Sequence, residues 1–391
     1  MTSQSDLNDH LWPTPAQETL LRAALTEGES AIEHFHAWCA MIDLAAEFDR
    51  GSYRLLPLLY ANMLRLNVTD SLMGRLKGTY RRTWCEAQRT LEQARDVLSL
   101  FHEHHIETLL IKGIPLAIAY YGNEALRPMA DFDIVVPHAK ATQAIKLLEE
   151  RGWKRGWMSR DEDVTFHHAM QFFHPKGGEV DLHWHILSEC RSVDADRHFR
   201  EYTEPLDVKG IATRQLGPTD ALFHTVVHGI RWNAEPPIRW IPDAITILRK
   251  AGPAIDWDRI LDFAEREKLS YRLRLGLTFL AERFAVPIPV YVLETLKRRR
   301  ITLLERIENT VVLHDGDKLY DKPLTKNWVI FVRYCRFQQA HGVLPFIDGL
   351  SHYIRIEWGL GGRSEIPLVI VRGLLRRLFR HKGAGGGTFH S

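Results

Sequence analysis

The spacing of apolar residues predicts two helical regions on either side of a mixed segment. Between residues 16 and 105, apolar residues recur every three or four positions and strand signals are absent, which is typical of amphipathic helices. The last helix of this region is expected to run from about Ser71 to His105, with a buried stripe of Leu91, Ala94, Val97, Leu98 and Phe101. After Pro218 the same spacing predicts further helices over 219–228, 256–267, 270–284, 289–313 and 326–339.

The segment between these regions alternates strand and helix patterns. Residues 107–112 form a short apolar run that ends at Gly113, and Pro115 suits the first turn of a following helix, where its missing N–H costs nothing. A second strand is expected around Phe132 and a helix over 139–151. Residues 166–175 and 179–186 are predicted to pair as a hairpin through Lys176-Gly-Gly178. We therefore expect an α+β fold, a small mixed sheet with helices, flanked by N-terminal and C-terminal helical regions.

These patterns predict four parts of the chain. They are an N-terminal helical region (1–105), a mixed α/β domain (106–216), a C-terminal helical domain (217–350), and a basic amphipathic segment with a flexible tail (351–391). The basic amphipathic stretch of the last part is 374–382, which precedes a glycine-rich stretch. We expect a solvated terminus there, with peripheral contact to a membrane surface or an acidic partner as the alternative.

Composition narrows the class of protein only slightly. The 391 residues leave room for two or more domains, and 45% hydrophobic and 26% charged residues are ordinary for a globular chain. A formal net charge of +2 indicates neither a nucleic-acid nor a membrane partner. The four cysteines form no CxxC pair, which argues against a zinc finger and a disulfide framework. The polar N-terminus does not resemble a signal peptide and no apolar run suits a membrane span, so we expect a cytoplasmic protein.

Three aspartates carry the candidate chemistry. Asp131 and Asp133 lie two residues apart at the start of the second predicted strand, so their carboxylates are expected to project from one face. Adjacent like charges repel unless a cation lies between them, and the simplest such cation is a divalent metal held by oxygen ligands. Asp181 supplies a third carboxylate on a later strand. The alternatives are a solvated turn with a helix cap for the pair, and an ordinary outward-facing acid for Asp181.

The histidines allow several interpretations. His183 and His185 share a strand face with Asp181, which is compatible with a zinc site. The sequence offers no matching Cys or His cluster, so a substrate-side or proton-transfer role for His183 is favoured. His224 and His228 share a helix face, but Thr225 stands where a His-Glu-x-x-His metalloprotease has its glutamate, so helix packing is favoured for this pair.

Three motifs, taken in order, resemble those of the nucleotidyltransferase superfamily of the DNA polymerase β type. They are Leu110-Ile-Lys-Gly113, Asp131-Phe-Asp-Ile-Val135 and Val180-Asp-Leu-His-Trp184. More narrowly, the chain resembles the uncharacterised bacterial nucleotidyltransferases with a Lys-Gly motif, from about Thr108 to Pro289. Further residues that carry this resemblance are Tyr120, Arg127, Leu222-Phe-His-Thr-Val-Val-His-Gly229 and Arg239-Trp-Ile-Pro-Asp243. The superfamily commonly has Gly-Ser or Gly-Gly in its first motif, from which Lys112-Gly113 departs.

The resemblance implies a metal-dependent enzyme that moves a nucleoside monophosphate from an NTP such as ATP to an acceptor hydroxyl and releases pyrophosphate. Asp131, Asp133 and Asp181 would then be catalytic and hold two Mg²⁺ or Mn²⁺ ions, which stabilise the attacking and leaving oxygens. The nucleotide would be bound by a second set of residues, Lys112, Gly113, Arg127 and His183. Gly113 would let phosphates approach a helix N-terminus, and the two cations would pair with the triphosphate.

The basic residues and the overall function have alternatives. Lys112 can be a surface lysine whose stem covers the end of a strand, and Arg127 can form a structural ion pair with Asp131 or Glu124. The chain can also be a catalytically silent nucleotide-binding or scaffold protein, or a toxin-like modifier of tRNA or protein. Local basic patches at Arg81-Arg82 and Lys297-Arg-Arg-Arg300 would serve that last function. The motifs specify neither the nucleobase nor the acceptor.

Overall fold

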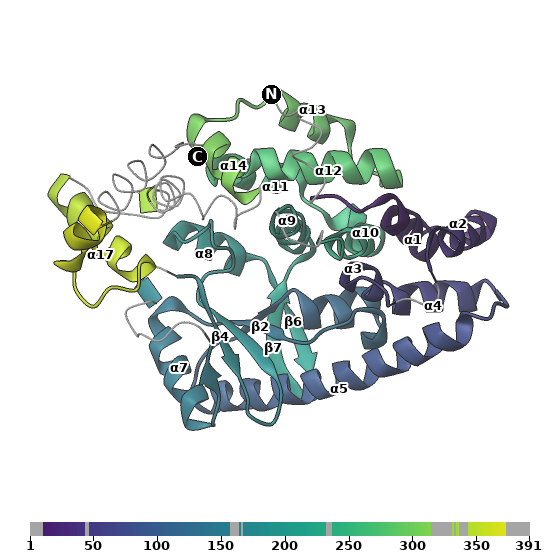
Figure 1. Cartoon of the computed structure of the whole chain (residues 1–391), viewed down its shortest axis with the longest axis horizontal. Coiled ribbons are helices and arrows are strands. Elements are labelled where there is room, and N and C mark those ends of the chain that lie inside the picture. The colour runs from purple at the N-terminus through teal and green to yellow at the C-terminus, as the bar shows by residue number, and fades with distance from the viewer. Residues whose placement is uncertain are drawn as a thin grey trace, which may run out of the picture. The chain divides into compact units, whose positions relative to one another are not determined.

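A seven-stranded mixed sheet lies within the first of two compact units, Met1–Tyr320 and Asp321–Ser391 (Figure 1). The computed structural model describes residues 11–43, 47–156, 164–165, 167–231, 237–313, 331, 334–335 and 343–372. The strands are β1 (Leu109–Ile111), β2 (Phe132–Val135), β3 (Lys154–Arg155), β4 (Ala169–Phe173), β5 (Glu179–His183), β6 (Thr203–Val208) and β7 (Ile211–Leu216). Their order is β3-β4-β5-β2-β1-β7-β6. β2 is parallel to β5 and antiparallel to β1, so the predicted mixed sheet with flanking helices is confirmed.

One face of the sheet packs against α5 (Met73–Glu103) and α7 (Ala141–Glu150). α5 corresponds to the predicted long helix, and the five apolar residues predicted for its stripe are all buried. They share a core cluster with Phe132 and Ile134 of β2. Figure 1 shows α5 running along this side of the sheet.

The opposite face of the sheet packs against the C-terminal helices, as the alternation of strand side chains requires. Leu109, Ile111 and Val135 belong to a second core cluster, whereas the intervening Leu110 and Ile134 belong to the first. The helices of this region are α8 (Val193–Glu201), α9 (Pro218–Gly229), α10 (Trp240–Ala251), α11 (Trp257–Arg266), α12 (Ser270–Phe284), α13 (Val290–Arg298) and α14 (Leu303–Val312). The second cluster also includes α1 (Pro15–Leu25), α2 (Gly28–Met41) and α4 (Leu56–Arg65), while α3 (Arg50–Tyr53) is a single turn.

The secondary structure differs from the sequence-based prediction in two places. The predicted helix over 289–313 is wrong, because α13 and α14 are separate helices: Arg299 is extended, and the Thr302 hydroxyl caps α14 by accepting from the Glu305 N–H. The β6–β7 hairpin was not predicted at all. It turns through Lys209 and Gly210, both with positive φ, and this Lys-Gly pair lacks the Asn-Gly or Asp-Gly signal of such turns.

The second unit contains α17 (Val343–Glu357). The predicted helix over 326–339 is described only at residues 331, 334 and 335, and the basic segment 374–382 lies outside the described residues. The division of the chain into four parts therefore stays a prediction. Among the helices that the structure describes, none combines the length and apolar character needed to cross a membrane.

A buried ion pair joins the C-terminal helices to the segment that leads into β2. Arg127 donates from Nε and Nη2 to the two carboxylate oxygens of Asp243 on α10, each at 2.9 Å, and both side chains are 5% exposed. Tyr121 also donates to Asp243 at 2.9 Å, and Arg239 donates to the carbonyl of Pro128 at 3.0 Å. The partner of Arg127 is therefore Asp243, and neither Asp131 nor Glu124 forms this ion pair.

We expect the Arg127–Asp243 ion pair, called the joint below, to contribute strongly to stability. Asp243→Ala leaves the Arg127 guanidinium buried without its counterion and should lower the free energy of unfolding by about 3–5 kcal/mol, measured by urea denaturation. The matched control is Glu294→Ala, because Glu294 pairs with Arg298 at 3.2 Å while the two side chains are 55% and 81% exposed. The control should cost less than about 1 kcal/mol. Equal effects of the two substitutions would contradict a structural role for the joint.

Candidate active site

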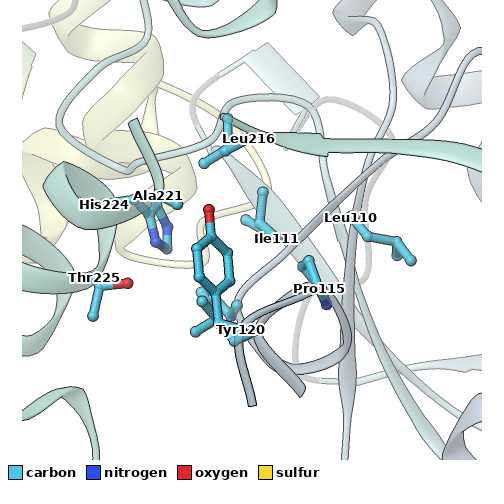
Figure 2. A pocket seen from close by; sticks show the side chains of 10 residues that line it. Leu110, Ile111, Pro115, Tyr120, Leu216, Ala221, His224 and Thr225 are labelled. Carbon is cyan, nitrogen blue, oxygen red and sulfur yellow. The ribbon is translucent and has the colours of Figure 1, made fainter. Parts of the chain in front are cut away.

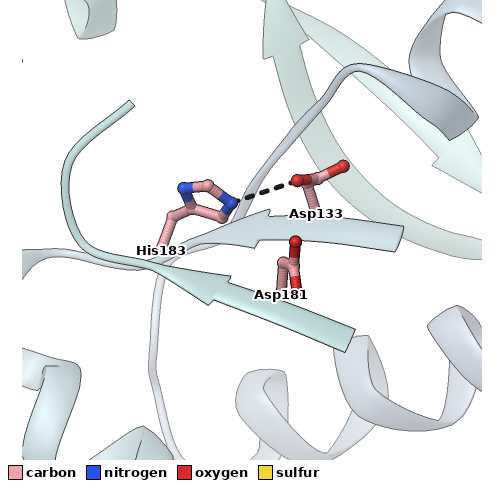
Figure 3. Close-up of side chains that lie close together, drawn as sticks. All are labelled: Asp133, Asp181 and His183. Atoms are coloured by element: carbon pink, nitrogen blue, oxygen red, sulfur yellow. Dashed lines mark hydrogen bonds and ion pairs between the residues drawn. The ribbon is translucent and has the colours of Figure 1, made fainter. Parts of the chain in front are cut away.

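The register of two parallel strands brings together three polar side chains. Asp133 of β2 lies opposite Asp181 of β5, and Val135 lies opposite His183. Residues in register share a face of the sheet, as do residues two apart in a strand. One ligand atom from each of Asp133, Asp181 and His183 lies within 4.8 Å of the others, on the face that also carries Val135 under the C-terminal helices. Figure 3 shows the three side chains on the adjacent strands.

Asp133 is buried and receives two hydrogen bonds on one oxygen. Lys112 Nζ and His183 Nε2 both donate to Asp133 Oδ1, the second at 3.1 Å. Burial alone would raise the pKa of Asp133, but the ammonium and the imidazole outweigh it and hold the pKa below its ordinary value. Burial and the charge of Lys112 lower the pKa of His183. Asp133 is therefore an ionised carboxylate beside a neutral imidazole.

Asp181 is the uncompensated member of the cluster. Burial and the negative charge of Asp133 raise its pKa to about 7. Its buried Oδ1 has no hydrogen-bond partner among the described residues. A divalent cation would satisfy this oxygen and neutralise both carboxylates, and Mg²⁺ and Mn²⁺ favour carboxylate ligands. The residues present thus fit a divalent metal.

Asp131 lies outside this cluster, and its metal-binding role stays a prediction. The strand β2 begins at Phe132, so strand alternation does not extend to Asp131, which is half-buried just before it. Asp131 is not part of the three-residue cluster. Its negative charge nevertheless contributes to the raised pKa of Asp181, so it lies within electrostatic reach of the site.

Lys112 lies at a tight turn from strand to helix, as the sequence predicted. β1 ends at Ile111, and α6 (Gly113–Pro115) and the π-helix η1 (Leu116–Tyr121) follow. Lys112 has φ 58° and ψ −111°, a conformation that residues with a Cβ rarely adopt. A Cβ on Gly113 would lie 3.1 Å from Met129 Sδ and 3.4 Å from Arg127 Nη1, so this position suits glycine.

A small cavity of about 20 Å³ adjoins the turn (Figure 2). Its lining includes Lys112, Tyr120 of η1, Leu216 of β7 and His224 of α9. Burial and the charge of Lys112 lower the pKa of His224 to about 3, so this histidine is neutral. The space suits a water molecule and is too small for a nucleotide.

His185 and Arg127, which the sequence also suggested as site residues, have partners outside the three-residue cluster. His185 Nδ1 lies 2.9 Å from Asp196 Oδ2 on α8, and Arg127 is bound to Asp243.

Arg231, which lies just after α9, was not identified from the sequence. Its side chain keeps contact with solvent, but the surrounding protein desolvates the guanidinium and lowers its pKa. The carboxylates of Glu189, Asp133 and Asp181 act in the opposite direction, which places Arg231 within electrostatic reach of the acids. No sequence motif marks Arg231, because its proximity to the acids arises only when α9 packs over the sheet.

Comparison with solved structures gives loose overlaps. The antibiotic-resistance factor ANT(2″)-Ia overlaps with a TM-score of 0.32 at 10% identity, covering 49% of this chain and 96% of that one. An antigenic nucleotidyltransferase-like protein from Paracoccidioides brasiliensis has a TM-score of 0.36 at 16% identity, with coverages of 55% and 96%. A tRNA-processing enzyme has a TM-score of 0.21 at 15% identity, with coverages of 71% and 95%.

Sequence comparison is more decisive. No curated protein matches the chain. Residues 51–285 match the family described as "Uncharacterised nucleotidyltransferase". The match spans more than half of the chain and contains β1, β2, β5 and the three-residue cluster. The chain therefore belongs to this uncharacterised nucleotidyltransferase family.

Proposed function

We propose that the chain is a metal-dependent nucleotidyltransferase that moves a nucleoside monophosphate from an NTP to an acceptor hydroxyl and releases pyrophosphate. The observation that carries the proposal is the pairing of Asp133 with Asp181 across β2 and β5, with His183 beside them. Two carboxylates that share a buried sheet face need a cation, and the family membership supplies the class of reaction. The two carboxylates favour Mg²⁺ or Mn²⁺.

Asp133 and Asp181 would hold the cation, with His183 as a ligand or as a hydrogen-bond donor that orients Asp133. Asp131 would add negative charge just before the N-terminal end of β2. When bound, the cation supplies positive charge for the attacking and leaving oxygens. Asp181 would also accept the proton of the attacking hydroxyl, because its Oδ1 has no hydrogen-bond partner among the described residues.

The triphosphate would lie beside Lys112, Gly113 and Arg231. The first two form the turn next to Asp133, and Arg231 is the exposed cation near the acids. Arg127 would act indirectly, because Asp243 holds its Nε and Nη2 while its Nη1 lies against Gly113. Its role is then to position the turn.

Activity is tested by incubating the protein with each labelled NTP, Mg²⁺ or Mn²⁺, and a total cell extract, and by measuring pyrophosphate release and the label transferred. Asp133→Asn and Asp181→Asn should each lower the rate by about 10²–10³-fold, the scale expected when one electrostatic stabiliser is lost. EDTA should abolish it. The control Asp194→Asn changes an exposed aspartate of α8 that pairs with Arg197, and it should leave the rate unchanged.

Two outcomes would contradict the proposal. Full activity in both Asp133→Asn and Asp181→Asn would remove the site from the reaction. Tight nucleotide binding without turnover, in the presence of extract and either metal, would indicate a silent nucleotide-binding protein.

The pKa of Asp181 predicts a pH-dependent stability in the metal-free protein. Between the ordinary value of 3.8 and about 7, the folded chain keeps a proton that the unfolded chain has lost, so stability falls as the pH rises through this window. Asp181→Asn removes the ionisable group. At pH 8 in EDTA this variant should be more stable than the wild type by about 2–4 kcal/mol, at about 1.4 kcal/mol per pKa unit. Urea denaturation at pH 5 should show at most about half of this gain, whereas a gain that does not vary with pH would contradict the assignment.

A further inference from the structure

We propose that Lys112 pairs with Asp133 in the place of a metal and exchanges Asp133 for the triphosphate when metal and nucleotide bind. The consequence is that metal and nucleotide each raise the affinity for the other. This inference rests on the proposed nucleotidyltransferase site and concerns the order in which that site is filled.

The first observation is the position of the ammonium group. Lys112 Nζ pairs with Asp133 Oδ1, the same oxygen that accepts from His183 Nε2. A metal that enters the cluster of Asp133, Asp181 and His183 meets a carboxylate that already has a cation. Metal binding at this oxygen therefore requires Lys112 to leave it, and this displacement weakens the affinity for metal alone.

The second observation is the backbone that holds Lys112. A residue with φ 58° and ψ −111° carries strain of about 1–3 kcal/mol, which glycine at this position would avoid. The turn is fixed because Ile111, the preceding residue, pairs with Asp133 in the sheet, and the following Gly113 packs against Met129. The contact of the lysine side chain with Asp133 is the best explanation for a lysine at such a position. The fixed Cα limits the ammonium to Asp133 and the space beside it.

The third observation is the environment into which the ammonium would be released. The side chain of Lys112 is only 19% exposed, and Asp133 is its one ion-pair partner among the described residues. The nearby His183 and His224 are neutral, because burial and Lys112 lower the pKa of each. An ammonium displaced by a metal would lack a counterion, which is unfavourable in a partly buried site. The phosphates of a nucleotide would supply one.

The exchange of Lys112 between Asp133 and phosphate couples the binding of the metal to the binding of the triphosphate. A metal that takes Asp133 frees Lys112 for the triphosphate, and a triphosphate that takes Lys112 frees Asp133 for the metal. Because coupling between two binding sites is reciprocal, each ligand must raise the affinity for the other by the same factor.

The test measures binding without turnover. Mn²⁺ binding to the full chain is followed by the electron paramagnetic resonance signal of free Mn²⁺. Binding of a fluorescent, non-hydrolysable α,β-methylene NTP analogue is measured with and without Mn²⁺. The wild type should bind the analogue about 5–150-fold more tightly with Mn²⁺, the usual range of such coupling. Lys112→Met should bind Mn²⁺ alone about tenfold more tightly than the wild type and show a smaller Mn²⁺ effect on the analogue.

Two further variants separate this effect from a general disturbance. Lys112→Arg keeps the positive charge and should bind Mn²⁺ alone as weakly as the wild type. Lys209→Met is the matched control: Lys209 also has a positive φ of 52°, precedes a glycine and pairs with a carboxylate, that of Glu92 at 2.8 Å. This control should leave Mn²⁺ binding unchanged. Thermal unfolding of each variant verifies that it is folded.

Unchanged Mn²⁺ affinity in folded Lys112→Met, or equal changes in Lys209→Met, would overturn the exchange. A wild type that binds Mn²⁺ and the analogue independently would also overturn it while leaving the proposed function intact. A wild type that binds neither ligand would instead contradict the proposed function itself.

Discussion

The repulsion between two carboxylates on one buried face of the sheet is the constraint on which the site depends. The parallel register of β2 and β5 places Asp133 against Asp181, and neither can move away without breaking the sheet. The fold relieves the repulsion in two ways. Lys112 and His183 keep Asp133 ionised, and the pKa of Asp181 rises to about 7. Two carboxylates on one buried face are unfavourable without a cation, and this is the physical basis of the proposed metal site.

The helices around the sheet keep the strands of Asp133 and Asp181 in this arrangement. α5 and α7 cover one face of the sheet, and α9 and α10 cover the face that carries the acids. The ion pair between Arg127 and Asp243 ties α10 to the segment that enters β2, and Arg239 adds a hydrogen bond to Pro128 in the same segment. The joint thus fixes the start of the strand on which Asp133 lies. The same short segment therefore both contacts α10 and leads into the strand that carries Asp133.

The sequence predicted the elements whose signals are local. Periodicity identified α5 and its buried stripe, the apolar run before Gly113 identified β1 and its turn, and alternation with Lys176-Gly-Gly178 identified the β4–β5 hairpin. The α13–α14 break and the β6–β7 hairpin were not predicted. Their signals, a Thr302 cap and a Lys209-Gly210 turn, are short and compete with the helical or polar pattern around them.

For the site, the sequence could select residue types but not partners. Strand alternation predicted that Asp131 projects with Asp133, yet the strand begins one residue later, and His183 from the neighbouring strand joins the cluster. The partner of Arg127 lies on a helix far along the chain, and only tertiary packing reveals it. Lys112 was recognised as a cation near the site, but its contact with Asp133 depends on a backbone conformation that no residue pattern specifies.

Asp133, Asp181 and His183 are proposed to hold a divalent cation during nucleotide binding. The most direct test is the anomalous scattering of crystals grown with Mn²⁺ and a non-hydrolysable NTP analogue. We expect an anomalous peak within coordination distance of Asp133 and Asp181, about 2.0–2.3 Å from their oxygens, and triphosphate density beside Lys112. Saturating Mn²⁺ with no peak at these carboxylates, or with Lys112 still paired to Asp133 beside a bound nucleotide, would contradict it.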